Sequence, residues 1–128
     1  MSASRLFGTN GVRGVVNVDL TIDLVLELSQ SIGTFFKCGR ILVGRDGRLS
    51  GRMLSEAVLA GLTSVGCEVC DIGMAPTPCI QHLVPYWGFD GAVVVTASHN
   101  PPEYNGVKVV ARDGVEVPRS DEELIEEI

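Results

Sequence analysis

Short apolar segments rich in β-branched residues alternate along the chain with longer segments whose apolar residues recur at helical spacing. The short segments predict strands at 15–18, 41–44, 67–73, 91–95, 107–110 and 115–117. The longer segments predict helices at 22–37, 51–65 and 78–84. This alternation predicts an α/β domain over residues 1–128, with a layered α/β/α arrangement and a mixed, mostly parallel sheet.

The ends of the predicted helices carry residues that favour starting or stopping a helix. The expected N-caps are Thr21, Ser50 and Thr77, and the glycines expected to end helices are Gly39 and Gly66. Pro78 suits the first helical position, because its ring presets the backbone angle of a helix. Segment 120–128 begins like a capped helix and stops without a closing glycine or a basic last turn, which is typical of a cut at a domain boundary.

Composition and charge exclude several classes of protein. The chain is 45% hydrophobic and 20% charged, as expected for a folded domain, and its net charge of -6 argues against a nucleic-acid partner. No apolar run is long enough to span a membrane, and the first residues lack the apolar core of a secretory signal. We therefore expect a cytoplasmic protein without a membrane partner, in which any anionic substrate is bound by a local group of Arg and Lys.

Four cysteines occur, at positions 38, 67, 70 and 79. Cys67 and Cys70 have the C-x-x-C spacing of some redox and zinc sites. On a strand, however, side chains three residues apart point to opposite faces, and a second pair of zinc ligands is not evident. We expect buried or half-buried free thiols.

Polar and charged residues follow several of the predicted strands. In an open α/β sheet, ligands bind at the carboxyl ends of the strands, so we expect segments 45–48, 73–76 and 96–100 to lie along one edge. In the last of these, Ser98 offers a hydroxyl beside the imidazole of His99. The same residue types are common in ordinary turns, so local composition leaves a functional site and a structural turn equally open.

Three groups of cations could serve such a site. Arg13 lies in the glycine-rich segment 5–14 and is either a phosphate-binding fork or a solvated residue of a loose N-terminal turn. Segment 45–48 holds two arginines around Asp46, and we favour an ion-pair network that supports a nearby site over direct phosphate binding. Lys108 lies between apolar neighbours on a strand, where its amine faces either the site or the solvent.

Several motifs together resemble one family, the α-D-phosphohexomutases, which include phosphoglucomutase, phosphomannomutase and phosphoglucosamine mutase. The matching motifs are FGTNGVRG at 7–14, VGRD at 43–46, APTP at 75–78, TASHNP at 96–101 and NGVK at 105–108. The segment 100–106 is most similar to the archaeal phosphomannomutase and phosphoglucomutase branch. One departure is Gly47, where many relatives carry threonine, which puts any hydroxyl contact there in doubt.

The resemblance implies a function and a set of site residues. Ser98 would carry a phosphoryl group and pass it to a hexose monophosphate, so that hexose 1-phosphate and 6-phosphate interconvert through hexose 1,6-bisphosphate. The implied catalytic residues are Ser98, His99, Lys108 and Arg13, and the implied substrate- or phosphate-binding residues are Thr9, Asn100, Asn105 and Arg45. Arg13 and Lys108 would neutralise phosphoryl charge, and His99 and Lys108 are candidates for proton transfer.

The resemblance also implies partners outside this sequence. Family members have four domains, and the matching motifs correspond to the first, so residues 1–128 would be one domain of a longer enzyme and inactive alone. Mg²⁺ would be bound by a phosphate oxygen on Ser98 and by an acidic loop of the second domain, since no Asp-x-Asp-x-Asp sequence occurs here.

Two other functions compete with this one. A serine–histidine hydrolase is disfavoured, because Ser98 is not in a G-x-S-x-G sequence and adjacent side chains on an extended loop point apart. A non-catalytic sugar-phosphate-binding module stays open. Within the family, the sequence does not distinguish mannose, glucose and glucosamine phosphates as substrates.

Overall fold

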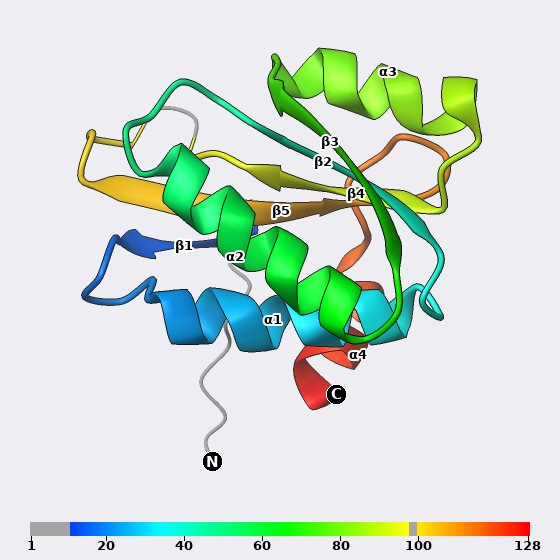
Figure 1. Ribbon diagram of the computed structural model, residues 1–128, viewed down its shortest axis with the longest axis horizontal. Helices are drawn as coiled ribbons and strands as arrows, with labels where there is room; N and C mark the ends of the chain where they lie inside the picture. The colour runs from blue at the N-terminus through cyan, green and yellow to red at the C-terminus, as the bar shows by residue number, and fades with distance from the viewer. Residues whose placement is uncertain (1–10, 98–99) are drawn as a thin grey trace.

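A computed structural model describes residues 11–97 and 100–128 (Figure 1). The elements are β1 Val12–Val15, α1 Ile22–Phe35, β2 Arg40–Arg45, α2 Gly51–Ser64, β3 Glu68–Met74, α3 Thr77–Trp87, β4 Gly91–Val95, β5 Tyr104–Val110 and α4 Arg119–Glu127. None of the helices in this part of the chain has the length and apolarity needed to cross a membrane.

The strands form a five-stranded sheet in the order β1-β5-β4-β2-β3. β2 pairs in parallel with both β3 and β4, whereas β5 pairs antiparallel with both β4 and β1. The expected mixed sheet is confirmed, although its parallel part is limited to β3, β2 and β4. The carboxyl ends of β1 to β4 and the amino end of β5 therefore lie along one edge of the sheet.

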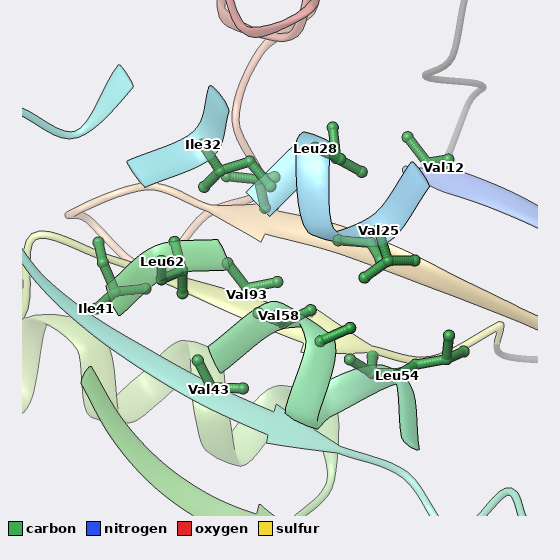
Figure 2. Packing of buried hydrophobic residues seen from close by; sticks show 14 of the residues in the cluster. Val12, Val25, Leu28, Ile32, Ile41, Val43, Leu54, Val58, Leu62 and Val93 are labelled. Atoms are coloured by element: carbon green, nitrogen blue, oxygen red, sulfur yellow. The ribbon is translucent and has the colours of Figure 1, made fainter. Parts of the chain in front are cut away.

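Helices cover both faces of this sheet, which confirms the predicted α/β/α layers. α1, α2 and α4 pack on one face through the larger core cluster, and α3 packs on the other through Ile80 and Val84. Figure 2 shows side chains of α1 and α2 meeting Ile41, Val43 and Val93 of the sheet. β4 is buried at every position, because it is central in the sheet and covered on both sides.

The predicted helix starts are close to the observed ones. Thr21 caps α1 as expected, and its Oγ1 accepts a hydrogen bond from the backbone N–H of Leu24 at 3.1 Å. Ser50 precedes α2, but its side chain does not cap the helix; its Oγ instead accepts a hydrogen bond from Asn105. α3 begins at Thr77 with Pro76 as N-cap, one residue before the predicted start.

The end of α1 and the first strand differ from the prediction. α1 ends at Phe35, because Lys37 and Cys38 take positive φ angles of 57° and 58° and turn the chain before Gly39. The first strand is β1, and segment 15–18 belongs mostly to a turn in which Val15 O accepts the N–H groups of the residues that follow. Arg13 therefore lies on a strand and not in a loose N-terminal turn.

Two predictions about the last third of the chain are also wrong in detail. The strand predicted at 107–110 begins at Tyr104, so Asn105 and Gly106 belong to β5 and pair with β1. Segment 115–117 was expected to be a strand, yet it forms only an isolated bridge between Glu116 and Val110. In the first case, Asn and Gly are common in turns, but pairing with β1 overrides this local preference.

The four cysteines are free thiols, as expected. Cys67 is buried, and burial raises the pKa of its thiol, to which the neighbouring Cys38 adds. The other three cysteines are exposed, so the prediction of buried or half-buried thiols is wrong for Cys38, Cys70 and Cys79. Within 11–97 and 100–128, no cluster of acidic, His or Cys side chains is placed to bind a metal.

Glu122 makes the stability of α4 depend on pH. It is 5% exposed, and Arg119 Nη1 lies 3.3 Å from its Oε1. Burial, together with the negative charges of Glu116 and Glu126, raises the pKa of Glu122, although Arg119 acts to lower it. Protonation of Glu122 therefore favours the folded state, and this contribution is lost as pH rises from the ordinary glutamate pKa through the raised pKa of the folded protein.

We expect Glu122→Gln to remove this pH dependence. The free energy of unfolding of the original protein, minus that of the variant, should fall as the pH rises above the ordinary glutamate pKa of about 4, as measured by urea titrations. Glu127→Gln, at an exposed position of the same helix, is the control and should leave the difference flat. Parallel curves for the original protein and Glu122→Gln would contradict the prediction.

Candidate functional site

The site lies where β4 ends at the shared edge of the sheet. Thr96 and Ala97 follow β4 and are buried. The N–H of Thr96 donates to Gly106 O at 3.0 Å, and its hydroxyl donates to Asp46 Oδ2 at 2.7 Å. The backbone that leads to Ser98 is thus held from β5 on one side and from the end of β2 on the other.

Arg13 connects β1 to both ends of the segment that contains Ser98 and His99. Its Nη1 donates to Ala97 O at 3.1 Å and to Asn100 Oδ1 at 2.8 Å. The N–H of Asn100 also donates to Ala97 O at 3.0 Å. A guanidinium group is therefore within hydrogen-bond distance of the residues immediately before and after the predicted catalytic pair.

The Arg13 side chain crosses β5 at Gly106, where no side chain is in the way. The two residues are register partners on β1 and β5, and a Cβ at Gly106 would lie 2.7 Å from Arg13 Cγ and 2.8 Å from Thr96 O. Neither the strand backbone nor the arginine stem has room for that atom. The absence of a side chain at Gly106 thus allows Arg13 to reach over β5 to the end of β4.

A second arginine contacts the loop from the opposite side. Arg48 donates from Nη1 to Pro101 O at 2.7 Å and to Tyr104 O at 3.0 Å, and from Nη2 to Asn100 O at 2.8 Å. Its Nε lies 3.4 Å from Asp46 Oδ2. Residues 46, 48 and 96 thus form one polar network that joins the ends of β2 and β4 to the loop before β5.

The other predicted site residues are placed differently. Ser98, His99 and Thr9 lie outside the described residues. Lys108 is half-buried on the same face of β5 as Gly106, two residues further into the strand, and its stem packs beside Gly11. Asn105 is fully buried, with Nδ2 donating to Ser50 Oγ at 2.9 Å, so its amide supports β5 and does not line the open edge.

Arg45 is separated from Arg13 by the sheet. It shares the face of β2 that bears Ile41 and Val43, and its stem packs against Gly51 at the start of α2. An open pocket of ≈ 330 Å³ is lined by Arg45, Asp46, Gly47, Met74, Ala75 and Pro76. A second, of ≈ 360 Å³, is lined by Asp46, Gly47, Arg48, Asn100 and Pro102. The two share Asp46 and Gly47, so the edge offers a continuous shallow surface.

The sequence interpretation assigned no specific contact to Arg48 or Thr96. The ion pairing expected within segment 45–48 is confirmed by the Asp46–Arg48 pair, whereas its support of a nearby site stays a prediction. The available signal was the order Arg-Asp-Gly-Arg directly after a buried strand, because an acidic residue between two arginines can orient one of them. No local signal pointed to the backbone carbonyls that Arg48 binds.

The described residues do not by themselves form a magnesium site. The polar network at this edge contains the carboxylate of Asp46. Both of its oxygens accept hydrogen bonds, Oδ1 from the backbone N–H of Arg48 and Oδ2 from the hydroxyl of Thr96. A magnesium ion needs several oxygen ligands, and no group of three candidate ligands is assembled in residues 11–97 and 100–128.

Comparison with known proteins gives a consistent result. Residues 4–128 match the family "Phosphoglucomutase/phosphomannomutase, alpha/beta/alpha domain I". A phosphoglucosamine/phosphogalactosamine mutase of Sulfurisphaera tokodaii is 59% identical over 125 residues, which are 97% of this chain and 28% of that protein. A phosphoglucomutase/phosphomannomutase of Thermococcus kodakarensis is 46% identical over 129 residues, 97% of this chain and 28% of that protein.

Solved structures agree with the sequence relatives. The crystal structure of a phosphoglucomutase/phosphomannomutase family protein from Burkholderia thailandensis matches with a TM-score of 0.84 and 32% identity, over 99% of this chain and 30% of that one. The chain thus spans less than a third of the length of the relatives that it matches. By sequence and by fold, the chain belongs to the phosphoglucomutase/phosphomannomutase family, which it matches through alpha/beta/alpha domain I.

Proposed function

We propose that this chain is the phosphoserine-bearing domain of a phosphohexomutase and that Ser98 carries the phosphoryl group. The observation that supports this most is the double contact of Arg13 with Ala97 and Asn100, on either side of residues 98 and 99. A guanidinium group held there stabilises negative charge on a phosphorylated serine, because its paired N–H donors match phosphate oxygens.

The proposed reaction has two half-reactions, and each transfers one phosphoryl group. The bond between phosphorus and the Ser98 oxygen breaks, and phosphorus bonds to the free hydroxyl oxygen of a hexose monophosphate. That hydroxyl loses its proton to His99, or to Lys108 where its amine is uncharged, and the departing Ser98 oxygen takes up a proton to become a hydroxyl again. The resulting hexose 1,6-bisphosphate reorients and returns its other phosphoryl group to Ser98, so hexose 1-phosphate and 6-phosphate interconvert. Electrostatic stabilisation of the transferring oxygens is the main task of the protein in such transfers.

The residues of this chain divide that task. Arg13 would hold the serine segment and neutralise phosphoryl charge, and Lys108 would add a second cation from the same face of the sheet. Asn100 would keep the segment in place through its contact with Arg13. Thr9 and Arg45 stay candidates for phosphate contacts, whereas Asn105 would act only by supporting β5.

The remaining parts of the site would come from outside the described residues. The proposal includes Mg²⁺, which would supply charge neutralisation when bound to a phosphate oxygen on Ser98 and to carboxylates of another domain. It also includes further domains of a longer protein that bind the sugar. Assays of the full protein with the 1-phosphates of glucose, mannose and glucosamine would identify the hexose, since relatives are named for different sugars.

Transfer of a phosphoryl group to the protein is the direct test. We expect the intact mass of the full protein to rise by one phosphoryl group after incubation with hexose 1,6-bisphosphate and Mg²⁺, and peptide mapping should place the group on Ser98. Excess hexose monophosphate should remove it. A protein that binds the bisphosphate without being labelled would instead be the non-catalytic sugar-phosphate-binding module.

A further inference from the structure

Arg48 donates hydrogen bonds to three backbone carbonyl groups, two in the loop between β4 and β5 and one at the first residue of β5. The carbonyls belong to Asn100, Pro101 and Tyr104, and the contacts measure 2.7 to 3.0 Å. In an extended chain, successive carbonyls point in alternating directions. Their convergence on a single side chain therefore requires a defined and curved path of the backbone from 100 to 104.

The guanidinium group is itself held in place. Asp46 Oδ2 lies 3.4 Å from Arg48 Nε, and Oδ1 accepts the backbone N–H of Arg48 at 3.1 Å. The carboxylate is fixed in turn by the hydroxyl of Thr96 at 2.7 Å. The Arg48 side chain is only 13% exposed, so solvent weakens these contacts less than it would on an open surface.

We propose that Arg48 is a positioning residue, which orients the segment containing Ser98 for phosphoryl transfer by fixing the backbone from Asn100 to Tyr104. This inference rests on the proposed function of Ser98. Arg13 holds Asn100 by its side chain and Arg48 holds it by its carbonyl, so the residue after the catalytic pair is fixed from two directions. Arg48 does not need to contact the substrate for this role.

The planar shape of the side chain is essential to the role. Arginine presents five N–H donors in a rigid fork, which can serve three carbonyls and one carboxylate at once. Lysine has the same charge but a single ammonium group on a flexible stem. Arg48→Lys should therefore keep the charge of the network and lose most of the alignment.

The test compares Arg48→Ala and Arg48→Lys with Arg52→Ala in the full protein. Arg52 is a matched control, because it is an arginine of the neighbouring α2 whose side chain is 80% exposed and pairs only with Glu56 in the contacts seen here. We expect kcat for hexose phosphate isomerisation to fall about 10- to 100-fold in Arg48→Ala, with little change in KM, as is typical for a small misplacement of reacting groups. Arg48→Lys should recover only a minor part, and Arg52→Ala should behave like the original protein.

Two readouts separate positioning from a general loss of stability. Hydrogen exchange in Arg48→Ala should accelerate at the N–H of Asn100 and of Tyr104, which bond within the loop, and should stay unchanged in β4. Added methylguanidinium should restore part of the lost kcat in Arg48→Ala, because it can donate to the same carbonyl groups, and should leave the kcat of Arg52→Ala unchanged.

Either of two outcomes would overturn the proposal. One is an unchanged kcat in Arg48→Ala, and the other is a loss explained by a lower fraction of folded protein, with uniform acceleration of exchange. Failure of the proposed function gives a different result, because the original protein would then show no isomerisation and no label on Ser98. In that case the exchange measurement still decides whether Arg48 holds the loop, and unchanged exchange at Asn100 and Tyr104 would refute it.

Discussion

Replacing Ser98 with alanine is expected to lower the proposed isomerase activity of the full protein by about 10⁴-fold or more, because the reaction would lose its covalent intermediate. Another hydroxyl would have to take its place for activity to remain. Thr96 is the nearest such residue along the chain, but its side chain is buried and donates to Asp46 at 2.7 Å. Labelling by hexose 1,6-bisphosphate should disappear together with the activity.

The measurement needs a coupled isomerisation assay and intact mass spectrometry of the same samples. Thr63→Ala is the control, since Thr63 has an exposed hydroxyl on α2 that bonds only to backbone carbonyls of its own helix in the contacts seen here. It should keep full activity and full labelling. Residual labelling in Ser98→Ala, at any other residue, would show that the phosphoryl carrier lies elsewhere.

Replacing Arg13 with alanine is expected to lower kcat by about 10²- to 10³-fold, the range for loss of one preorganised electrostatic donor. The variant loses a positive charge beside the segment that contains Ser98. It also leaves Ala97 O and Asn100 Oδ1 without their arginine donor. The second effect should destabilise the fold by about 1–3 kcal/mol, because these groups are at least partly buried.

Two further variants separate the roles of charge and geometry. Arg13→Lys should keep part of the activity, because the charge stays while the two-point contact is lost. Arg112→Ala is the control, since Arg112 is an exposed arginine that pairs with Asp90 at 2.7 Å. A wild-type kcat in Arg13→Ala would remove Arg13 from the mechanism, even if urea titrations showed the predicted loss of stability.

The layers of the fold follow closely from local patterns. The run 91–95 predicted a buried strand, and the structure buries all five residues between helices on both faces. Helical spacing of the apolar residues predicted α1 and α2, and residues on those apolar faces, such as Val25, Leu28 and Leu62, are buried in the core. These predictions succeed because side-chain periodicity is a property of the backbone geometry of each element.

Errors occur where a local preference competes with a distant partner. Ser50 is a residue type that often caps helices, but its hydroxyl oxygen instead accepts a hydrogen bond from the Asn105 side chain. Asn105 and Gly106 are residue types common in turns, but they pair with β1 as part of an antiparallel strand. In both cases the partner is on another element, so a window of neighbouring residues does not contain the deciding contact.

The sequence alone therefore determined the alternation of strands and helices from α1 to β5, the apolar faces and the family to which the motifs belong. Only the tertiary structure decided that Arg13 reaches residues 84 and 87 positions away, passing over Gly106. It also decided that Arg48 binds loop carbonyls and that Arg45 lies on the other face of the sheet. The reason is physical: periodicity along the chain specifies which side of an element is buried, whereas contacts between elements depend on the order and direction of the strands in the sheet.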